Sequence, residues 1–239
     1  MSKVFYQVLS TGSMRAEHLH VGMLCSKRGA LVGVAFGHRG YMANSRNMAI
    51  QAFLKTDADV LIQCDEDVIP PLNILNLAAH GKSLIGTIAL HASNTGPSVN
   101  SAPLPGDGPT FPMERGDSPL RKVAWFGTGC YSITRQLAED MIAAYGAMFH
   151  QENTKDGLRA AGVDVVMCRR ARMIGHDAWI DRSMVCGQGG GGSIGWHVSH
   201  LHQVGCGFGS ERLSAARVAV STDGASARFA RAQRALRSA

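Results

Sequence analysis

Short apolar runs of strand character alternate with segments of helical periodicity along most of the chain, which is typical of an α/β domain. The pattern predicts strands at residues 4–9, 31–36, 60–64, 83–89, 123–126 and 178–180. It predicts helices at residues 16–27, from 44 or 45 to about 55, from 70 to about 80, and at 135–145 and 164–174. Because helices that connect successive strands allow parallel pairing, we expect one mostly parallel sheet flanked by helices in a single domain.

Local signals refine three of these segments. Leu19, Met23 and Leu24 recur at helical spacing and predict the apolar stripe of the first helix. Asn44 or Ser45 can cap the first turn of the second helix. Residues 91–120 are rich in Pro, Gly, Ser and Asn and show little periodicity, which indicates a functional lid or an irregular insertion.

The composition excludes several classes of protein. Of the 239 residues, 45% are hydrophobic and 18% are charged, which suits a globular domain rather than a disordered or fibrous chain. No run approaches the ~20 consecutive apolar residues of a membrane-spanning helix, and the first residues lack the features of a signal peptide. The six cysteines are widely spaced with no C-x-x-C pair, so we expect buried free thiols and a cytoplasmic location.

The net charge of +6 is unevenly distributed along the chain. Residues 212–239 contain six arginines and one acid, a net charge of +5, whereas residues 1–211 contain 18 basic and 17 acidic residues. This division predicts a nearly neutral domain at 1–211 and a basic tail at 212–239, helical or disordered. Three interpretations of the tail remain open: a solvated terminus, an arm that follows the phosphates of a nucleic acid, and a contact with an anionic membrane.

The segment Asp65-Glu66-Asp67 directly follows the apolar run at residues 60–64. Ligands of open α/β sheets bind outside the carboxyl ends of the strands, which is where this triplet lies. Because alternate residues of an extended segment point the same way, Asp65 and Asp67 are expected to converge while Glu66 points elsewhere. Two convergent carboxylates suit Mg²⁺ or Mn²⁺ shared with a diphosphate. The alternative is a solvated acidic turn.

Three stretches together resemble the family 2-like glycosyltransferases of the GT-A fold, including phage-encoded members. Their order and spacing over residues 4–200 carry the resemblance, and no single stretch is decisive. The stretches are Ser45-Arg46-Asn47 through Asp65-Glu66-Asp67, Trp125-Phe126-Gly127-Thr128-Gly129-Cys130-Tyr131 with the residues up to Arg135, and Asp164-x-x-Met167-Cys168-Arg169-Arg170-Ala171-Arg172-x-x-Gly175-x-x-x-Trp179-x-Asp181.

This resemblance implies that a nucleoside-diphosphate sugar binds at the first of these stretches. Asp65 would approach the ribose and a Mn²⁺ or Mg²⁺ ion, and Asp67 would bind the ion directly. The remaining donor-binding residues that it implies are Thr11 and Gly12 against the nucleoside, Arg15 at a phosphate, Arg46 and Asn47 at the nucleotide, and Gly127 and Thr128 in the donor-sugar and acceptor pocket.

For catalysis, the resemblance implies that Asp164 is the general base of an inverting, hexosyltransferase-type reaction. Two alternatives to these roles stay open: Arg46 can pair with a nearby acid, and Asp164 can be the N-cap of its helix.

The sequence departs from the family pattern at two places. Val163 stands where the family usually has Glu, and Cys186-Gly187-Gln188 stands where the family commonly supplies a metal-binding His. His197, beyond the glycine run at 189–192, is our candidate for the further metal ligand. We interpret the glycine run as a loop over the diphosphate, because no P-loop Lys-Ser/Thr follows it.

The sequence therefore predicts a metal-dependent glycosyltransferase that uses a nucleoside-diphosphate sugar, with UDP as the favoured nucleotide and a hydroxyl as acceptor. Some phage enzymes that resemble this chain add sugars to hydroxymethylated bases in DNA, and the basic tail suits such an acceptor in a host cytoplasm. A surface polysaccharide or lipid-linked glycan is the alternative acceptor. Two other functions are possible rivals. One is a non-catalytic nucleic-acid-binding protein. The other is a nucleotidyltransferase, which would need a third acid near the metal and a phosphate-binding Gly-rich loop after the first strand.

Overall fold

The computed structural model describes residues 2–12, 14–37, 42–93, 96–108, 110, 117–153 and 159–188. For residues 90–93, 96–99, 159, 160 and 188 it describes the backbone alone. The predicted glycine loop, the metal-ligand candidate His197 and the basic tail at 212–239 lie outside these residues.

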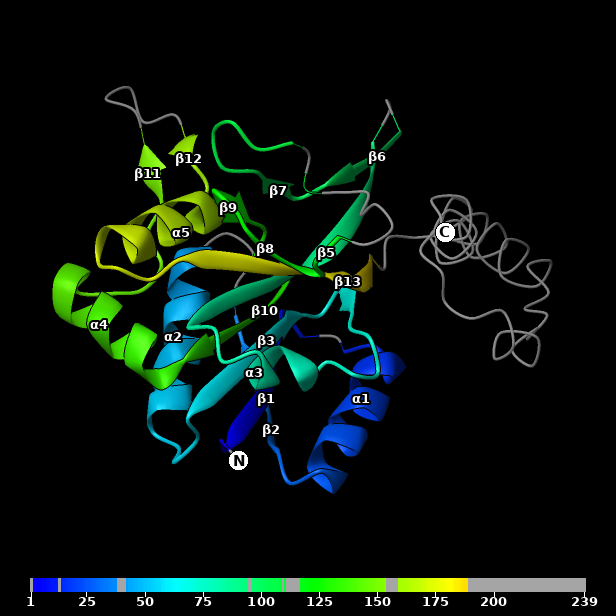
Figure 1. The fold of residues 1–239 in the computed structure, drawn as a ribbon. Helices are drawn as coiled ribbons and strands as arrows, with labels where there is room; N and C mark the ends of the chain where they lie inside the picture. Colours follow the sequence, from blue (N-terminus) through cyan, green and yellow to red (C-terminus); the bar gives the residue numbers. More distant parts are fainter. Residues whose placement is uncertain are drawn as a thin grey trace, which may run out of the picture. The chain divides into compact units, whose positions relative to one another are not determined.

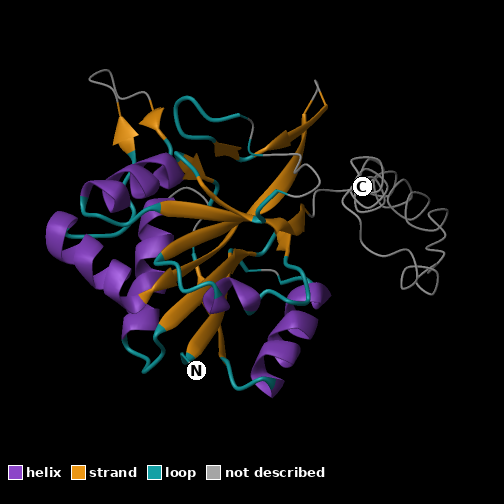
Figure 2. Ribbon diagram, in the orientation of Figure 1, coloured by secondary structure: helices purple, strands orange, loops and turns teal. Residues whose placement is uncertain are grey.

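A nine-stranded mixed sheet forms the centre of the described fold (Figures 1 and 2). Its strands follow the order β2 (Leu31–Phe36), β1 (Val4–Ser10), β3 (Val60–Asp65), β10 (Cys130–Thr134), β5 (Leu84–Ser93), β13 (Ala178–Gln188) and β4 (Val68–Ile69), with β6 (Gly96–Val99) on β5 and β8 (Leu120–Lys122) on β13. The pairs β1–β2, β1–β3 and β5–β13 are parallel, whereas β10 is antiparallel to both β3 and β5. The principal strands β2, β1, β3, β5 and β13 therefore run in one direction, and the predicted mostly parallel α/β sheet is confirmed.

Helices cover both faces of this sheet. On one face, α2 (Met42–Leu54), α4 (Arg135–Tyr145) and α5 (Val163–Met173) pack on a core that includes Phe5 and Leu61. On the other face, α1 (Ala16–Lys27) and α3 (Asn76–Ala79) pack on Tyr6 and Ile62. The consecutive residues of β1 and β3 thus enter opposite cores, because side chains alternate across a strand. Strands buried on both faces explain why the sequence shows continuous apolar runs rather than alternation.

The insertion at residues 91–120 contains more regular structure than the sequence predicts. β5 continues to Ser93 and turns into β6, and β7 (Ser101–Ala102) pairs with β9 (Trp125–Phe126). A second small sheet joins β11 (Glu152–Asn153) to β12 (Arg159–Ala161). The strands β6, β7, β11 and β12 are short and carry few large apolar side chains, so no hydrophobic pattern in the sequence predicts their pairing.

The bounds of α1 and α4 match the prediction, but the predicted apolar stripe of α1 is wrong. Leu19 and Met23 are exposed, and the helix buries His18, Val21, Gly22 and Cys25 instead. Gly22 faces the sheet because a Cβ there would lie 3.2 Å from Cγ1 of Val32, so the helix approaches β2 closely.

Two predicted helix starts are also wrong. α2 begins at Met42, so Asn44 and Ser45 lie inside its first turn rather than at its cap. The helix expected from Pro70 is reduced to turns followed by the four residues of α3.

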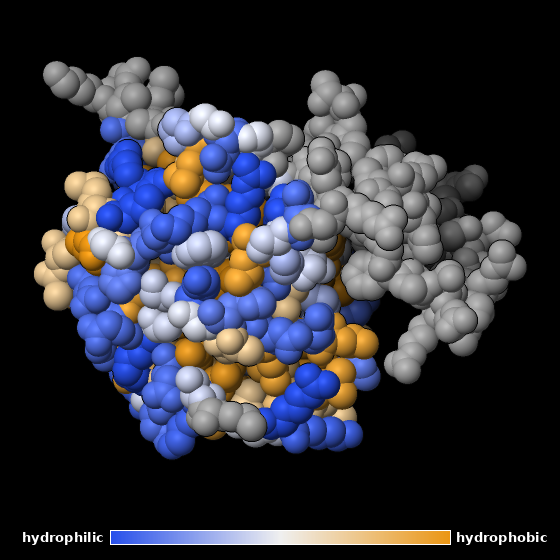
Figure 3. All heavy atoms as spheres, in the orientation of Figure 1, coloured by the Kyte–Doolittle hydropathy of each residue, from blue (hydrophilic) through white to orange (hydrophobic). Residues whose placement is uncertain are grey.

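The sheet edge at β2 exposes part of its apolar side chains, including Val34 at 39% and Phe36 at 70%. The view in Figure 3 shows a mainly hydrophilic surface with hydrophobic residues in several separate places. Within the described part of the chain, none of the helices combines the length and apolar character needed to cross a membrane.

A substitution at Gly86 would test the packing at the centre of the sheet. A Cβ at Gly86 would lie 2.4 Å from Cδ2 of Phe126, whose side chain is fully buried. We expect Gly86→Ala to lower the free energy of unfolding by about 1–3 kcal/mol, the usual cost of overpacking a core. Gly108→Ala is the control, because a Cβ there would meet no atom of the described residues within 4 Å. Equal urea denaturation midpoints for the two variants would contradict this packing.

Candidate functional site

The carboxyl ends of β1 and β3 lie side by side and form the edge at which the candidate site is built. The two strands pair in parallel with Leu9 opposite Asp65. The backbone N–H of Asp65 donates to the carbonyl of Gly129 at 2.8 Å, and the N–H of Glu66 donates to the carbonyl of Leu9 at 3.0 Å. The acidic triplet is therefore held by its own backbone between β10 and β1.

Arg46 lies beneath this edge and contacts the first acid of the triplet. Its side chain comes from α2 and is only 2% exposed. One terminal nitrogen donates to Oδ2 of Asp65 at 2.7 Å, and the other donates to Oε1 of Gln63 at 3.1 Å. The guanidinium lies 5.9 Å from the ring centre of Tyr131 and 5.8 Å from that of Phe149, within the range of cation–π attraction.

The alternative that Arg46 pairs with a nearby acid is confirmed. The role that this geometry supports is to hold the Asp65 carboxylate in place and charged. A direct contact between Arg46 and a nucleotide stays a prediction.

A chain of buried hydrogen bonds extends from Arg46 across the sheet. The hydroxyl of Tyr131 donates to Oε1 of Gln63 at 2.6 Å, and Nε2 of Gln63 donates to Oε1 of Gln7 at 2.9 Å. Burial raises the pKa of Tyr131, so its hydroxyl stays a donor. Gln7 and Gln63 were not among the predicted site residues, although a glutamine inside each of two apolar strands was the available signal.

One carboxylate oxygen of Asp65 accepts no hydrogen bond from any residue that the structure describes. Its side chain is 19% exposed, yet Oδ1 is buried and has no hydrogen-bond partner among the described residues. Burial raises the pKa of Asp65, and the neighbouring Asp67 and Glu66 add to that effect, whereas Arg46 opposes it. An unsatisfied anionic oxygen at a sheet edge suits a bound cation, because an unpaired buried polar atom is costly.

Asp67 lies in the turn that connects β3 to β4 and is exposed. β4 pairs with the end of β13, where the backbone of Gln188 lies opposite Val68. The segment Cys186-Gly187-Gln188 stands where the family that the sequence resembles commonly supplies a metal-binding His. It therefore ends opposite Val68, the residue after Asp67. Among the described residues, no group of three or more His, Cys, Asp or Glu side chains is arranged to hold a metal ion by itself.

Glu66 makes its contacts with the loop after β1, and the predicted convergence of Asp65 and Asp67 stays a prediction. It accepts hydrogen bonds from the backbone N–H and the hydroxyl of Thr11 and from the hydroxyl of Ser10. Gly12, next in this loop, has a φ of +124°, a conformation that favours glycine. Thr11 and Gly12 thus lie at the same edge as Asp65, and their contact with a nucleoside stays a prediction.

Arg15 occupies the N-cap position of α1 in an extended conformation. Its carbonyl accepts a hydrogen bond from the N–H of His18 at 3.1 Å. A contact of Arg15 with a phosphate stays a prediction.

The side chain of Asn47 binds the backbone of Phe149 in the described fold. Its amide donates to the carbonyl of Phe149 and accepts from the N–H of Phe149, both at 2.9 Å. These two bonds anchor the segment that supplies an aromatic ring beside Arg46. A contact of Asn47 with the nucleotide stays a prediction.

Gly127 and Thr128 lie in the loop between β9 and β10 that leads to Gly129, the backbone partner of Asp65. The N–H of Gly127 donates to the carbonyl of Asn100 at 2.7 Å. A Cβ at Gly127 would lie 1.8 Å from Nδ2 of Asn100, so a side chain there would require the side chain of Asn100 to move. Thr128 is 5% exposed. Their place in a donor-sugar pocket stays a prediction.

Asp164 lies in the first turn of α5, which begins at Val163 after an N-cap at Gly162. The alternative that Asp164 is the N-cap is therefore wrong. Its Oδ1 accepts a hydrogen bond from the N–H of Val165 at 3.0 Å. Its role as a general base stays a prediction.

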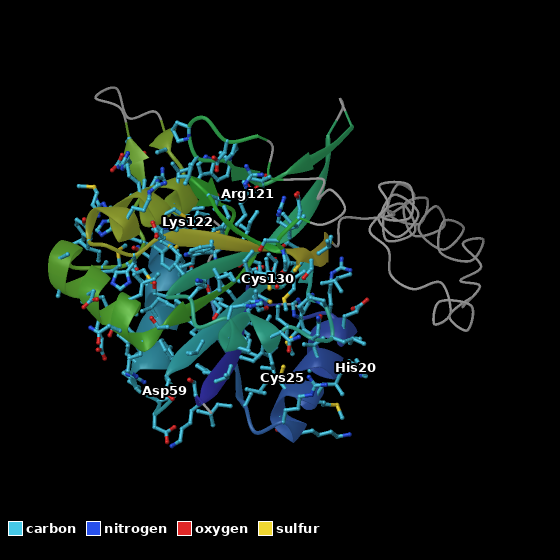
Figure 4. The ribbon with its side chains drawn as sticks, viewed as in Figure 1. His20, Cys25, Asp59, Arg121, Lys122 and Cys130 are labelled. Carbon is cyan, nitrogen blue, oxygen red and sulfur yellow. The ribbon has the colours of Figure 1, made fainter. Side chains whose placement is uncertain are left out.

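The five cysteines within the described residues are free and buried, as predicted: Cys25, Cys64, Cys130, Cys168 and Cys186. Figure 4 shows Cys130 deep in the fold near the crossing of the central strands. Burial raises the pKa of Cys25 to about 11 and that of Cys168 to about 12, so these thiols are protonated near neutral pH.

Comparison with known proteins shows similarity at the level of the fold. No protein family model and no curated protein sequence matches the chain. Solved structures to which it is similar include A197 from STIV, with a TM-score of 0.49 and 17% identity over 77% of this chain and 84% of the other. GalNAc-T7, solved with UDP, GalNAc and Mn²⁺, has a TM-score of 0.47 and 12% identity. The matched region covers 79% of this chain and 44% of GalNAc-T7.

The inositol-1-phosphate CTP transferase from T. maritima has a TM-score of 0.47 and 9% identity over 85% of this chain and 96% of the other. In fold class the chain is an α/β protein with a mostly parallel central sheet flanked by helices, and this assignment rests on its own strand order and directions.

The buried pair of Arg46 and Asp65 leads to a test by a double-mutant cycle. We expect Arg46→Met to lower the free energy of unfolding by about 3–5 kcal/mol, because it leaves a buried carboxylate without its counter-charge. Adding Asp65→Asn should recover a large part of this loss, since the double variant buries no unpaired charge. Urea denaturation of the four proteins at pH 7 measures the coupling, and strictly additive effects would contradict the pairing.

The same variants test how the free energy of unfolding depends on pH. In Arg46→Met, burial raises the pKa of Asp65 with no guanidinium to oppose it. A carboxyl with a folded-state pKa above its unfolded value of about 4 stabilises the fold at low pH, and this stabilisation is lost as the pH rises through the folded-state pKa. The Arg46→Met protein should therefore gain stability relative to the double variant as the pH falls from 7 towards 4.

Proposed function

We propose that this chain is a metal-dependent glycosyltransferase that takes its sugar from a nucleoside-diphosphate donor. The observation that carries the proposal is the Asp65 carboxylate at the carboxyl end of β3. Arg46 holds its Oδ2, while its buried Oδ1 has no partner among the described residues. Ligands of open α/β sheets bind at such strand ends, and an anionic oxygen in this position suits a cation that bridges to phosphate.

Asp65 and the exposed Asp67 are the residues proposed to hold Mn²⁺ or Mg²⁺. Magnesium sites commonly use one or two carboxylates and complete their coordination with water and substrate phosphates. Two acids without a third protein ligand are therefore compatible with this role. The chemistry that such a cation supplies when bound is neutralisation of the charge on the diphosphate leaving group.

The nucleoside is proposed to lie against the loop formed by Ser10, Thr11 and Gly12, with UDP as the nucleotide. The loop follows β1 and Asp65 ends the neighbouring parallel strand β3, which supports the proposal that they border one ligand position. A hydroxyl acceptor would enter from the opposite side of the donor, where we propose Asp164 as the general base of an inverting, hexosyl-type transfer.

Asp67 provides the direct test of this function. We expect wild-type protein to release UDP slowly from a UDP-sugar when Mn²⁺ is present, and Asp67→Ala to abolish the release. Because Asp67 is exposed in a turn, this substitution should leave the melting temperature unchanged.

Asp57→Ala is the matched control, because Asp57 is an exposed carboxylate near the amino end of β3, at the opposite end of the sheet. Figure 4 labels the nearby Asp59, which lies at that end. If no sugar nucleotide is turned over with Mn²⁺ or Mg²⁺, the chain is instead a binding module without this activity.

We further propose a hydroxymethylated base in DNA as the acceptor, with residues 212–239 binding the phosphates. The support is the charge division in the sequence, since the tail carries +5 while residues 1–211 carry +1. A basic arm raises the local concentration of a polyanionic acceptor without taking part in the chemistry.

Deleting residues 212–239 tests this acceptor. We expect the deletion to leave UDP-sugar hydrolysis unchanged and to reduce glycosylation of hydroxymethylated DNA at low salt. Binding of the full chain to DNA should weaken steeply as salt rises, because phosphate contacts release counterions. Unchanged DNA glycosylation by the shortened protein would contradict the role of the tail.

A further inference from the structure

Glu66, the middle acid of the triplet, makes its contacts with the loop after β1 rather than towards the open edge. Its Oε2 accepts the hydroxyl of Ser10 at 2.8 Å and the backbone N–H of Thr11 at 2.9 Å. Its Oε1 accepts the hydroxyl of Thr11. Both carboxylate oxygens are thus engaged with donors from one short loop.

The backbone strengthens this connection between the two strand ends. The N–H of Glu66 donates to the carbonyl of Leu9 at 3.0 Å, and Leu9 lies opposite Asp65 in the parallel pair. The turn that contains Glu66 is therefore attached to the loop through both main chain and side chain. Any displacement of the loop must break several hydrogen bonds to a charged group, which are stronger than neutral ones.

The contacts continue from Ser10 to Gly12. The hydroxyl oxygen of Ser10 accepts the N–H of Gly12 at 3.1 Å while its hydrogen is donated to Glu66. Gly12 has a φ of +124°, and a Cβ at this position would meet nothing within 4 Å. The glycine is required for its backbone conformation, and no atom of the described residues crowds this side of the loop.

These contacts distinguish Glu66 from its neighbours. Within the described part of the chain, Oδ1 of Asp65 has no hydrogen-bond partner and Asp67 is exposed, whereas both oxygens of Glu66 bind the loop. A carboxylate engaged in this way is poorly suited to bind a cation, because coordination would require giving up these donors.

We infer that Glu66 is a positioning residue that holds the loop of Ser10, Thr11 and Gly12 in the conformation that receives the nucleoside, next to the cation-binding Asp65. This inference rests on the proposed function and extends it. Glu66 acts through the loop and does not contact the reacting atoms. The three acids therefore have different roles. Asp65 and Asp67 hold the cation, and Glu66 positions the adjoining nucleoside-binding loop.

The test compares Glu66→Ala with Glu66→Gln in the full-length protein. In the glutamine variant, the amide oxygen can accept the two Oε2 bonds, and the amide nitrogen can donate to the hydroxyl of Thr11. We expect Glu66→Ala to weaken binding of UDP with Mn²⁺ by about 10- to 100-fold, from the loss of hydrogen bonds to a charged group. Glu66→Gln should recover binding to within about threefold of wild type, because hydrogen-bonding groups remain at both positions.

Kinetics and hydrogen exchange separate positioning from a general loss of structure. Glu66→Ala should raise KM for the UDP-sugar more than it lowers kcat, and the amide of Thr11 should lose protection from exchange. Glu139→Ala, which removes an exposed glutamate on α4, is the control and should change none of these values.

Each alternative outcome has a distinct meaning. If Glu66→Gln binds as weakly as Glu66→Ala, the negative charge itself is required and the positioning role is overturned. If wild type binds UDP but Glu66→Ala binds it equally well, the inference alone is wrong. If wild-type protein binds no nucleotide with Mn²⁺ or Mg²⁺, the proposed function is wrong and the inference falls with it.

Discussion

The site depends on one buried electrostatic contact, between the guanidinium of Arg46 and the carboxylate of Asp65. Burial alone would favour the neutral form of Asp65, and Arg46 is the group that opposes this effect. The surroundings of Arg46 follow from the same requirement, because a cation removed from water needs partners on every side. Gln63 takes a second nitrogen, and the rings of Tyr131 and Phe149 lie over the guanidinium. The interior of the sheet thus stabilises a charge at its edge.

The arrangement of strands turns this contact into a ligand site. β1 and β3 end together, so the loop after one strand and the acidic turn after the other are neighbours. In the turn, successive acids point in different directions, and each therefore has a different environment. Asp65 points into the interior towards Arg46, Glu66 reaches the β1 loop, and Asp67 is exposed. A stretch of three like charges is stable here because one is paired with a cation, one is hydrogen-bonded and one is in water.

The strands β1, β2 and β3 and two of the helices could be predicted closely because their signals are local. The bounds of α1 and α4 follow from helical periodicity, and Thr134 caps α4 through its side chain. The buried face of α1 could not be predicted, because Leu19 and Met23 have the right spacing but lie on the solvent side. Close packing against Val32 selected the face with Gly22 instead. The antiparallel β10 was also beyond prediction, since strand direction depends on how a connection returns to the sheet.

The sequence by itself determined the class of fold and the place of the acidic triplet. Apolar runs require burial on both faces, and a polar triplet directly after such a run must lie at a strand end. Only the tertiary structure decided which partners these acids have. Arg46 meets Asp65 across 19 residues of chain, and Asn47 holds the backbone of Phe149 across 102. Such contacts arise when helices and strands pack in three dimensions, and no periodicity along the chain encodes them.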